Sequence, residues 1–233
     1  MIYLVRHAQS KANTGEVTPN KEMPDNRIPL TDLGVKQARE LGTQLKEMGA
    51  LENSLIFHSP FRRTAHTLAA ALKEVDYYVP TINSVNEYSQ EDPRLREVDV
   101  GTGKFHENIR ERARVGWFYY RFPNGETPCE VYDRSCSFFN EAMVKCLSQG
   151  KDMVCISHGM TIRALLMRAM NLTVEDFNKM DNPSNCSVIR IGQAENLDEN
   201  DISIFDPKTD LAAAGVVFRK EARGNDYSNM VEM

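Results

Sequence analysis

Apolar and polar positions change along the chain with two periods, one typical of strands and the other of helices. Short apolar runs predict buried strands at residues 2–5, 54–59, 152–157 and 186–192. Between these runs, apolar residues recur every three or four positions and predict helices, the first with Thr31 as its N-cap and Gly49 as its stop. Strands that alternate with helices predict an α/β fold with three layers, α/β/α, and a mostly parallel central sheet.

The same pattern predicts how the chain is organised. Residues 1–192 are expected to form one domain, with a small helical cap at about 105–128. Residues 193–233 are expected to form a C-terminal extension, a hairpin packed on the domain followed by a mobile tail. The polar stretch 9–29 predicts a long loop over the functional site, since loops of this length in compact domains usually serve function. The remaining predicted elements are a strand within 77–85, a helix opened by Pro60, and helical segments at 105–122, 130–147, 160–170 and 174–180.

Composition narrows the classes of protein to which the chain can belong. With 28 Lys+Arg against 33 Asp+Glu the formal net charge is −5, which argues against a nucleic-acid partner or an anionic membrane surface. No apolar run approaches the roughly 20 residues that span a bilayer, and the start does not resemble a signal peptide, so we expect a cytoplasmic protein. Five cysteines without CxxC spacing argue against a disulfide scaffold, and Cys155 and Cys186 are expected to be buried free thiols.

Cationic and reactive side chains follow three of the predicted strands where those strands end. The first strand runs into Arg6 and His7, the second is followed by Arg62 and Arg63, and a later strand runs into His158. The carboxyl ends of parallel strands meet at one edge of a sheet, and ligands bind beyond that edge. We therefore expect these side chains to converge beside helix N-termini, which also attract anions. Such a pocket is suited to a phosphate group.

Seven sequence blocks in a fixed order identify a family. They are LVRHAQSKAN, IPLTDLGVKQA, SPFRRTAHT, LREVDVG, NGET, ISHGMTIRALL and NCSVIRI. On these blocks the chain resembles the histidine phosphatase superfamily, with its phosphoglycerate-mutase-like fold, over about residues 1–192. The resemblance implies a phosphatase that hydrolyses a small phosphorylated substrate through a phosphohistidine, without a metal or cofactor.

The resemblance also implies roles for the residues at the strand ends. His7 matches the nucleophile, which must be neutral to attack phosphorus, and flanking guanidinium groups disfavour its protonation. Arg6 and Arg63 would clamp the phosphoryl oxygens, and His158 would donate a further hydrogen bond to one of them. Arg63 is chosen because the family's clamping arginine follows the strand-end serine by four positions. Arg62 is the alternative.

Three further residues take their expected roles from the same blocks. Glu97 matches the proton donor, which protonates the leaving oxygen and then activates water, so we predict an acidic to neutral pH optimum. Asn13 matches a phosphate-contacting asparagine, and Gly159 is grouped with the phosphate-binding residues. Ala8 departs from the glycine that most members carry. It should be tolerated if the backbone keeps a negative φ.

Other functions stay open at this point. The short segment between Glu97 and NGET favours hydrolysis over a 2,3-bisphosphoglycerate-dependent phosphoglycerate mutase, although the arginines near position 112 could hold a second anionic group. A phosphate-binding docking module without turnover is the non-enzymatic alternative. A catalytic metal is not expected, because no HxxxH or HxH spacing occurs and the arginines would repel a cation. The aromatic residues within 117–122 predict either a substrate lid or core. The oligomeric state is not readable from the sequence.

Overall fold

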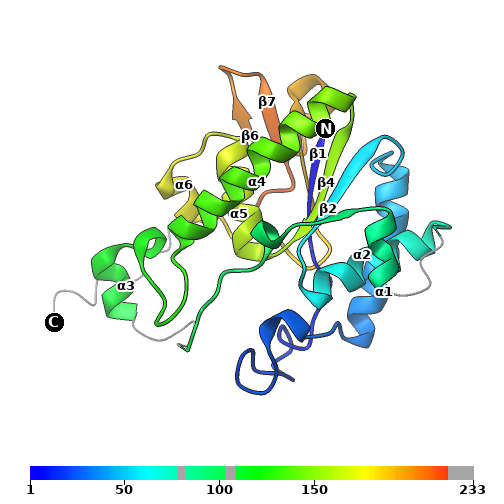
Figure 1. Cartoon of the computed structure of the whole chain (residues 1–233). Helices are drawn as coiled ribbons and strands as arrows, with labels where there is room; N and C mark the ends of the chain where they lie inside the picture. Colours follow the sequence, from blue (N-terminus) through cyan, green and yellow to red (C-terminus); the bar gives the residue numbers. More distant parts are fainter. Residues whose placement is uncertain (78–81, 103–108, 220–233) are drawn as a thin grey trace.

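The computed structural model describes residues 1–77, 82–102 and 109–219, in which the strands of one sheet alternate with helices (Figure 1). The strands are β1 (Ile2–Arg6), β2 (Ser54–His58), β3 (Gln90–Glu91), β4 (Asp152–Ser157), β5 (Val188–Gln193), β6 (Ile202–Asp206) and β7 (Leu211–Ala214). The α-helices are α1 (Asp32–Glu47), α2 (Arg62–Glu74), α3 (Ile109–Val115), α4 (Pro128–Gln149), α5 (Gly159–Ala169) and α6 (Val174–Lys179).

The sheet confirms the predicted α/β fold, but only part of it is parallel. Its strand order is β3-β2-β4-β1-β5-β7-β6. The strands β3, β2, β4 and β1 pair in parallel, whereas β5, β7 and β6 are added by antiparallel pairing. Arg6 lies opposite Ser157, and His58 lies opposite Ile156. The carboxyl ends of β1, β4 and β2 therefore lie side by side, as the sequence predicted.

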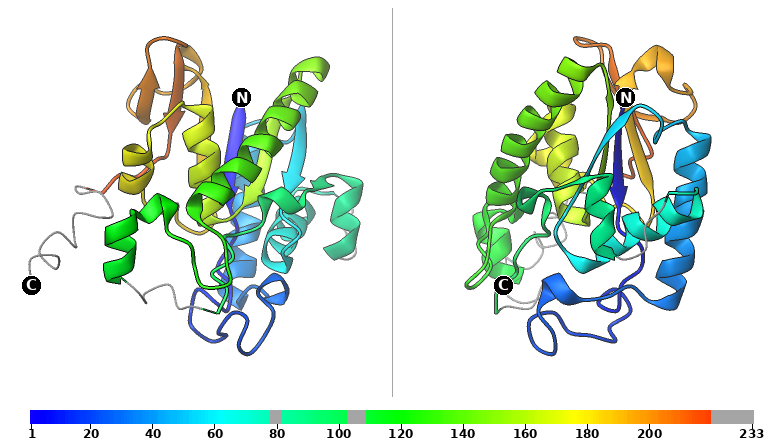
Figure 2. Two further views of the ribbon diagram at one scale, coloured as in Figure 1. Left: turned by 60° about the vertical axis from the view of Figure 1, so that its left-hand side comes forward. Right: turned by 45° about the vertical axis from the view of Figure 1, so that its right-hand side comes forward.

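Helices cover both faces of the sheet, which explains why its central strands are apolar without interruption. Leu4 and Cys155 pack into the core under α4, α5 and α6. Their neighbours Val5, Val154 and Ile156 pack into the core under α1 and α2, because successive strand residues point to opposite faces. The right-hand view of Figure 2 shows the sheet between these two helical layers.

Helix α1 begins and ends where the sequence predicted. The Thr31 Oγ1 atom accepts a hydrogen bond from the Gly34 amide at 3.0 Å, and Gly49 follows the helix with a φ of 67°. Gly34 also allows close packing, since a Cβ atom there would lie 2.0 Å from the carbonyl oxygen of Gln9. The start of α1 is thereby packed directly on the beginning of the 9–29 loop.

Three predicted elements differ from the structure. Residues 82–87 form a 3₁₀ helix rather than a strand. The apolar Val85 is explained by burial, because this turn packs on the α1 and α2 layer. The predicted helix 105–122 is shorter, since α3 ends at Val115 and Gly116 follows with a φ of 90°. The expected C-terminal hairpin forms from β6 and β7, but it extends the central sheet beside β5 instead of packing on the domain as a separate unit. Residues 78–81, 103–108 and the expected mobile tail from 220 lie outside the described residues, and the domain boundary at 192 stays a prediction.

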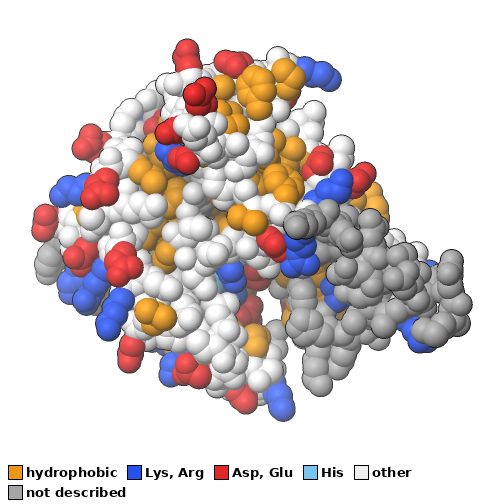
Figure 3. All heavy atoms as spheres, turned by 180° about the vertical axis from the view of Figure 1, so that it is seen from behind, with side chains coloured by type: hydrophobic (Ala, Val, Ile, Leu, Met, Phe, Trp, Pro, Cys, Tyr) orange, Lys and Arg blue, Asp and Glu red, His pale blue; other side chains and the backbone are white. Residues whose placement is uncertain are grey.

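Surface properties agree with the mixed composition. On the face shown in Figure 3, positive and negative side chains are interspersed over the part that the structure describes. Within the described part of the chain, no helix combines the length and apolar character needed to cross a membrane. All five cysteines are free thiols, with Cys155 buried and Cys186 half-buried.

Candidate active site

A cavity of about 500 Å³ lies at the carboxyl edge of the parallel strands. It is bounded by the end of β1, the start of α2, the loop after β1 and the segment that follows β3. Helices α2 and α5 begin at this edge, so their N-termini lie beside it. The lining residues are Arg6, His7, Ser10, Ala12, Asn13, Thr18, Pro19, Asn20, Asp25, Asn26, Phe61, Arg63, Arg96, Glu97, Val98, Asp99, Val100, Met160 and Asn182.

His7 is held in one tautomer, and its surroundings favour the neutral imidazole. Its Nδ1 atom lies 2.7 Å from the carbonyl oxygen of Ala8. A carbonyl oxygen can only accept, so Nδ1 carries the proton and Nε2 keeps its lone pair. Burial, together with the charges of Arg63 and Arg6, holds the pKa of His7 well below its usual value of 6.5. These features give His7 the protonation state that a nitrogen nucleophile needs.

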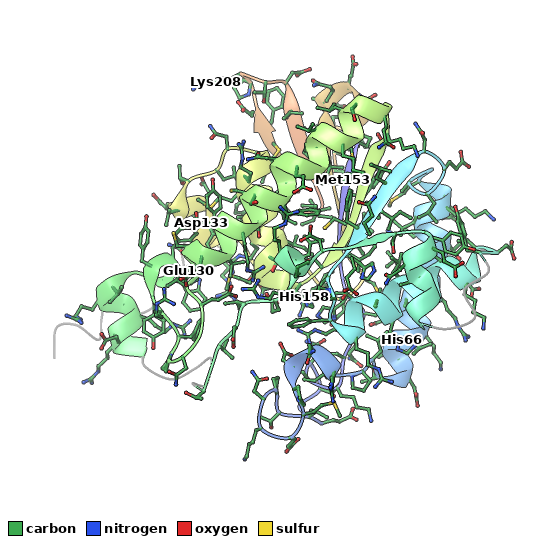
Figure 4. The ribbon with its side chains drawn as sticks, viewed as in Figure 1. His66, Glu130, Asp133, Met153, His158 and Lys208 are labelled. Carbon is green, nitrogen blue, oxygen red and sulfur yellow. The ribbon has the colours of Figure 1, made fainter. Side chains whose placement is uncertain are left out.

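The ring of His158, which is labelled in Figure 4, packs edge-on against the ring of His7, with the two centroids 5.1 Å apart. The Arg63 Nε–H group donates to His158 Nδ1 at 3.3 Å, so the proton of His158 is on Nε2, which donates to Ser59 Oγ at 2.8 Å. Burial and the charge of Arg63 hold the pKa of His158 well below 6.5. His158 is fully buried and does not line the cavity, so its donor is engaged by Ser59 in this structure.

Arg63 forms an ion pair that the sequence did not predict. Its Nη1 atom donates to Asp25 Oδ1 at 2.8 Å and to the Asp25 carbonyl oxygen at 2.8 Å, and Nη2 donates to Oδ2 at 3.3 Å. The guanidinium group also stacks on Phe61, with 4.8 Å from Cζ to the ring centroid. Asp25 belongs to the loop 9–29, so a loop carboxylate occupies the side of Arg63 that would bind an anion.

Arg6 lines the cavity, and Asn13 keeps a donor for a ligand. The Arg6 Nη1 atom donates to the Pro183 carbonyl oxygen at 2.6 Å, whereas Nε is buried and has no partner in the described structure. Asn13 Oδ1 accepts from the amide and hydroxyl groups of Ser10 at 3.0 and 3.1 Å and from Asn185 Nδ2 at 3.3 Å. The carbonyl side of Asn13 is therefore satisfied, which leaves its amide nitrogen to donate.

Glu97 enters the cavity from the segment between β3 and the NGET turn. Its Oε1 atom accepts from the Val98 amide at 3.0 Å, and Oε2 accepts a long bond of 3.5 Å from Met160 at the start of α5. Burial lowers the pKa of Arg6, and the nearby Glu97 carboxylate partly opposes this shift by favouring the charged guanidinium group. His7, Arg6 and Glu97 therefore face the same space.

The structure brings most of the predicted residues together at the cavity. Arg6, His7, Asn13, Arg63 and Glu97 line it, and Arg62 is exposed. His158 packs against His7 and is not among the lining residues, as described above. Gly159 is the first residue of α5 and is not among the lining residues, and its grouping with the phosphate-binding residues stays a prediction. A Cβ atom at Gly159 would lie 2.9 Å from the Asn182 side chain, which explains why a small residue fits.

The departure at Ala8 is tolerated as expected. Ala8 is buried and is not among the residues with positive φ. Its amide donates to Thr67 Oγ1 at 3.0 Å. The extra methyl group packs with Leu30 and Ala38, so the backbone that carries His7 is fixed by the α1 and α2 layer.

Residues 110–122 serve the core rather than the cavity. The side chains of Trp117, Phe118, Tyr120 and Phe122 are buried in the core beneath α4, whereas Tyr119 is 55% exposed. Arg112 stacks on Trp117 at 3.7 Å. None of these residues lines the cavity. Of the two interpretations left open, core packing is the one that the structure supports.

Sequence reasoning missed two residues that line the cavity and two that contact its histidines. Asp25 and Asn182 line the cavity, Asn185 donates to the His7 carbonyl oxygen at 2.8 Å, and Ser59 accepts from His158. Asn185 and Ser59 lie inside blocks that carried the resemblance, so a signal was present for both. Asp25 lies in a loop without periodicity, where no sequence pattern gives its partner. The described residues contain no group of three or more metal-ligating side chains.

Comparison with known proteins agrees with this geometry. A family model described as histidine phosphatase superfamily (branch 1) matches residues 2–199. The chain is 31% identical to phosphoglycerate mutase-like protein AT74 of Arabidopsis thaliana, over 92% of this chain and 71% of that protein. It is 28% identical to a 2,3-bisphosphoglycerate-dependent phosphoglycerate mutase of Nitrobacter winogradskyi, over 75% of this chain and 83% of that protein.

A solved structure shows the same fold. The mycobacterial glucosyl-3-phosphoglycerate phosphatase complexed with VO3 superposes with a TM-score of 0.62 at 23% identity, covering 82% of this chain and 90% of that one. Because the family model matches nearly the whole chain, the chain belongs to the histidine phosphatase superfamily. Members of this superfamily are phosphatases or mutases, and the protein is an enzyme of this kind.

Proposed function

We propose that the protein is a metal-independent phosphomonoesterase that acts through a phosphohistidine on His7. The observation that carries the proposal is the state of His7 in the cavity. Its Nδ1–H is committed to the Ala8 carbonyl oxygen, its pKa is lowered, and the Nε2 lone pair is free. Arg6, Arg63 and Glu97 share the cavity with it. A neutral, oriented imidazole between guanidinium groups suits attack on a phosphate dianion.

The proposed reaction has two displacements at phosphorus. In the first, the Nε2 lone pair of His7 forms the N–P bond while the P–O ester bond breaks, and the leaving oxygen takes the proton of the Glu97 carboxyl group. In the second, the Glu97 carboxylate takes a proton from water as the water oxygen bonds to phosphorus and the N–P bond breaks. Inorganic phosphate, neutral His7 and protonated Glu97 are the products, so the cycle closes.

Four side chains would bind the phosphoryl group around this path. Arg6 contributes its guanidinium group, and Asn13 contributes its amide nitrogen. Arg63 contributes its guanidinium group once the phosphoryl oxygens replace Asp25. His158 fixes Arg63 through Nε, and its own donation to a phosphoryl oxygen requires Nε2–H to leave Ser59. The Asp25 carboxylate thus balances the charge of Arg63 before substrate enters.

The charges around the cavity favour hydrolysis over mutase activity. A mutase must also hold the carboxylate and second phosphate of a bisphosphoglycerate, which needs cationic groups beyond the phosphoryl clamp. Among the described lining residues, only Arg96 is cationic outside that clamp, and it is paired with Glu126. Asp99 adds a negative charge on the same side. The described wall of the leaving-group side therefore suits an uncharged alcohol better than an anionic one.

Two measurements on the purified protein test the proposal. The first is release of inorganic phosphate from p-nitrophenyl phosphate, sugar phosphates, glycerate phosphates, nucleotides and phosphopeptides, with and without EDTA. The second is interconversion of 2- and 3-phosphoglycerate in the presence of 2,3-bisphosphoglycerate. We expect hydrolysis that persists in EDTA and little isomerisation. Efficient isomerisation would favour the mutase, and binding of phosphate without any turnover would favour a docking module.

A further inference from the structure

The segment that carries Glu97 is held outside any sheet or helix, by side chains and by two backbone bonds, from Glu126 N to Asp99 O at 2.8 Å and from Thr102 N to Pro123 O at 3.0 Å. Residues 96–102 form no helix or strand. The backbone carbonyl oxygens before Glu97 accept hydrogen bonds from other elements instead. Ser157 Oγ, at the end of β4, donates to Leu95 O at 2.8 Å, and Thr161 Oγ1, on α5, donates to Arg96 O at 2.7 Å. The position of the proposed proton donor therefore depends on side-chain contacts.

Arg134 on α4 makes the largest share of these contacts. Its Nη1 atom donates to the carbonyl oxygens of Arg94 and Arg96 at 2.6 and 2.8 Å, and Nη2 donates to the Glu97 carbonyl oxygen at 3.2 Å. Nε and Nη2 also bind the two carboxylate oxygens of Glu126 at 3.0 and 3.1 Å. The side chain is 10% exposed, so little water competes for these bonds.

Glu126 extends this arrangement to the other side of Glu97. Its Oε2 atom accepts from the Asp99 amide at 3.1 Å, and Oε1 also pairs with Arg96. Arg134 and Glu126 together bind the backbone at residues 94, 96, 97 and 99, which bracket the proton donor. A planar guanidinium group can make these divergent bonds at once, whereas a lysine ammonium group cannot reproduce the fork.

From this arrangement we propose that Arg134, with Glu126, is a positioning residue for the Glu97 proton donor. General acid catalysis requires the donor to lie within hydrogen-bond reach of the leaving oxygen. Arg134 binds the backbone of Glu97 and does not line the cavity, so it acts on proton transfer without touching substrate. The inference deepens the proposed function and rests on Glu97 as the acid.

The test compares two substrates whose leaving groups differ in how much they need protonation. A p-nitrophenolate leaving group departs with little protonation, whereas an alkoxide such as that of β-glycerophosphate departs only when protonated. Arg134→Lys keeps the charge and loses the fork. We expect its kcat/KM to fall at least about tenfold more for β-glycerophosphate than for p-nitrophenyl phosphate, since general acid catalysis contributes about 10²- to 10⁴-fold. Glu126→Gln, which retains the shape and replaces one acceptor oxygen, should show the same selectivity.

Reference variants separate this inference from the proposed function. Glu97→Gln should show the same dependence on leaving group. Arg121→Ala removes an exposed ion pair with Glu130 of α4 and should lower neither kcat/KM value. An equal loss on both substrates in folded Arg134→Lys and Glu126→Gln would overturn the positioning role. A Glu97→Gln variant without leaving-group dependence would instead overturn Glu97 as the acid. If Arg134→Lys does not fold, Glu126→Gln alone decides between selective and equal loss.

Discussion

The two sides of the cavity are built in different ways. On the phosphoryl side, Arg6 ends β1, His7 follows it, and His158 follows β4, so their backbone is fixed by the ladder of a parallel sheet. On the leaving-group side, Glu97 lies in a segment without regular structure that side chains such as Arg134 hold in place. The geometry of the phosphoryl side is set by the central sheet, whereas that of the leaving-group side depends on a few polar contacts.

This difference indicates where the enzyme is constrained and where it is adaptable. The phosphoryl group is common to all substrates of such an enzyme, and it would meet the part of the site that the central sheet fixes. The leaving group varies between substrates, and it would meet the part that loops form. Asp25 adds a loop contact to the phosphoryl side, because it lies in the 9–29 loop and pairs with Arg63 at the start of α2. Loops positioned by a rigid scaffold commonly carry specificity in this way.

The largest expected effect is at the nucleophile. His7→Ala should lower kcat by roughly 10⁴-fold or more, as loss of other enzymatic nucleophiles does. His66→Ala is the matched control, since His66 lies farther out along α2 and does not line the cavity (Figure 4). Steady-state hydrolysis and a circular dichroism spectrum of each variant check the result. Substantial turnover by folded His7→Ala would contradict the covalent role.

The next effect concerns the clamp on the same side. Arg63→Ala should lower kcat/KM by about 10²- to 10³-fold, the loss expected for one preorganised contact to developing charge. Arg62→Ala, which removes the exposed neighbour, should have little effect. Kinetics of both variants on p-nitrophenyl phosphate decide the assignment. A larger loss in Arg62→Ala would mean that the clamp is displaced by one residue.

The lowered pKa values of His7 and His158 also predict how stability depends on pH. In the unfolded chain each imidazole binds a proton as the pH falls through about 6.5, whereas in the folded state burial and Arg63 oppose protonation. The unfolded state then binds more protons, so the free energy of unfolding falls below pH 6.5, by up to about 1.4 kcal/mol per pH unit for each histidine. Urea denaturation at pH 7 and pH 5 should show a smaller fall for His7→Asn. Parallel falls in the two proteins would contradict this origin.

The smallest effect concerns the pair between the 9–29 loop and Arg63. Asp25→Asn removes a carboxylate that competes with phosphate for Arg63, so inhibition by inorganic phosphate or vanadate should become roughly threefold to tenfold stronger, equivalent to about 1 kcal/mol. Asp25→Glu keeps the charge and serves as the control. Inhibition constants at constant ionic strength give the comparison. Weaker inhibition in Asp25→Asn would show that Asp25 orients Arg63 instead of competing with the ligand.

The sequence predicted the phosphoryl side well for physical reasons. A buried strand has a recognisable apolar pattern, and a polar residue directly after it must lie at the edge of the sheet. Arg6, His7 and His158 could therefore be placed near one another without any tertiary information. Thr31 and Gly49 likewise mark helix ends through local backbone chemistry.

Long-range side-chain contacts lay beyond such reasoning. The partner of Arg63 is 38 residues away in a loop without periodicity, and Arg134 binds carbonyl groups 37 to 40 residues before it. Nothing in local pattern or propensity encodes these pairings. Val85 and the 117–122 aromatics were ambiguous for a related reason, since apolar character indicates burial without specifying a strand, a turn or a lid.

Trapping of the covalent intermediate tests the central claim most directly. The protein is mixed rapidly with p-nitrophenyl phosphate, quenched in alkali, in which phosphohistidine is stable, and digested for mass spectrometry. The account predicts one phosphoryl group on His7 in the wild type, its loss in mild acid, and its absence in His7→Ala. Turnover by the wild type with no phosphoryl group on His7, or with the group on another side chain, would contradict it.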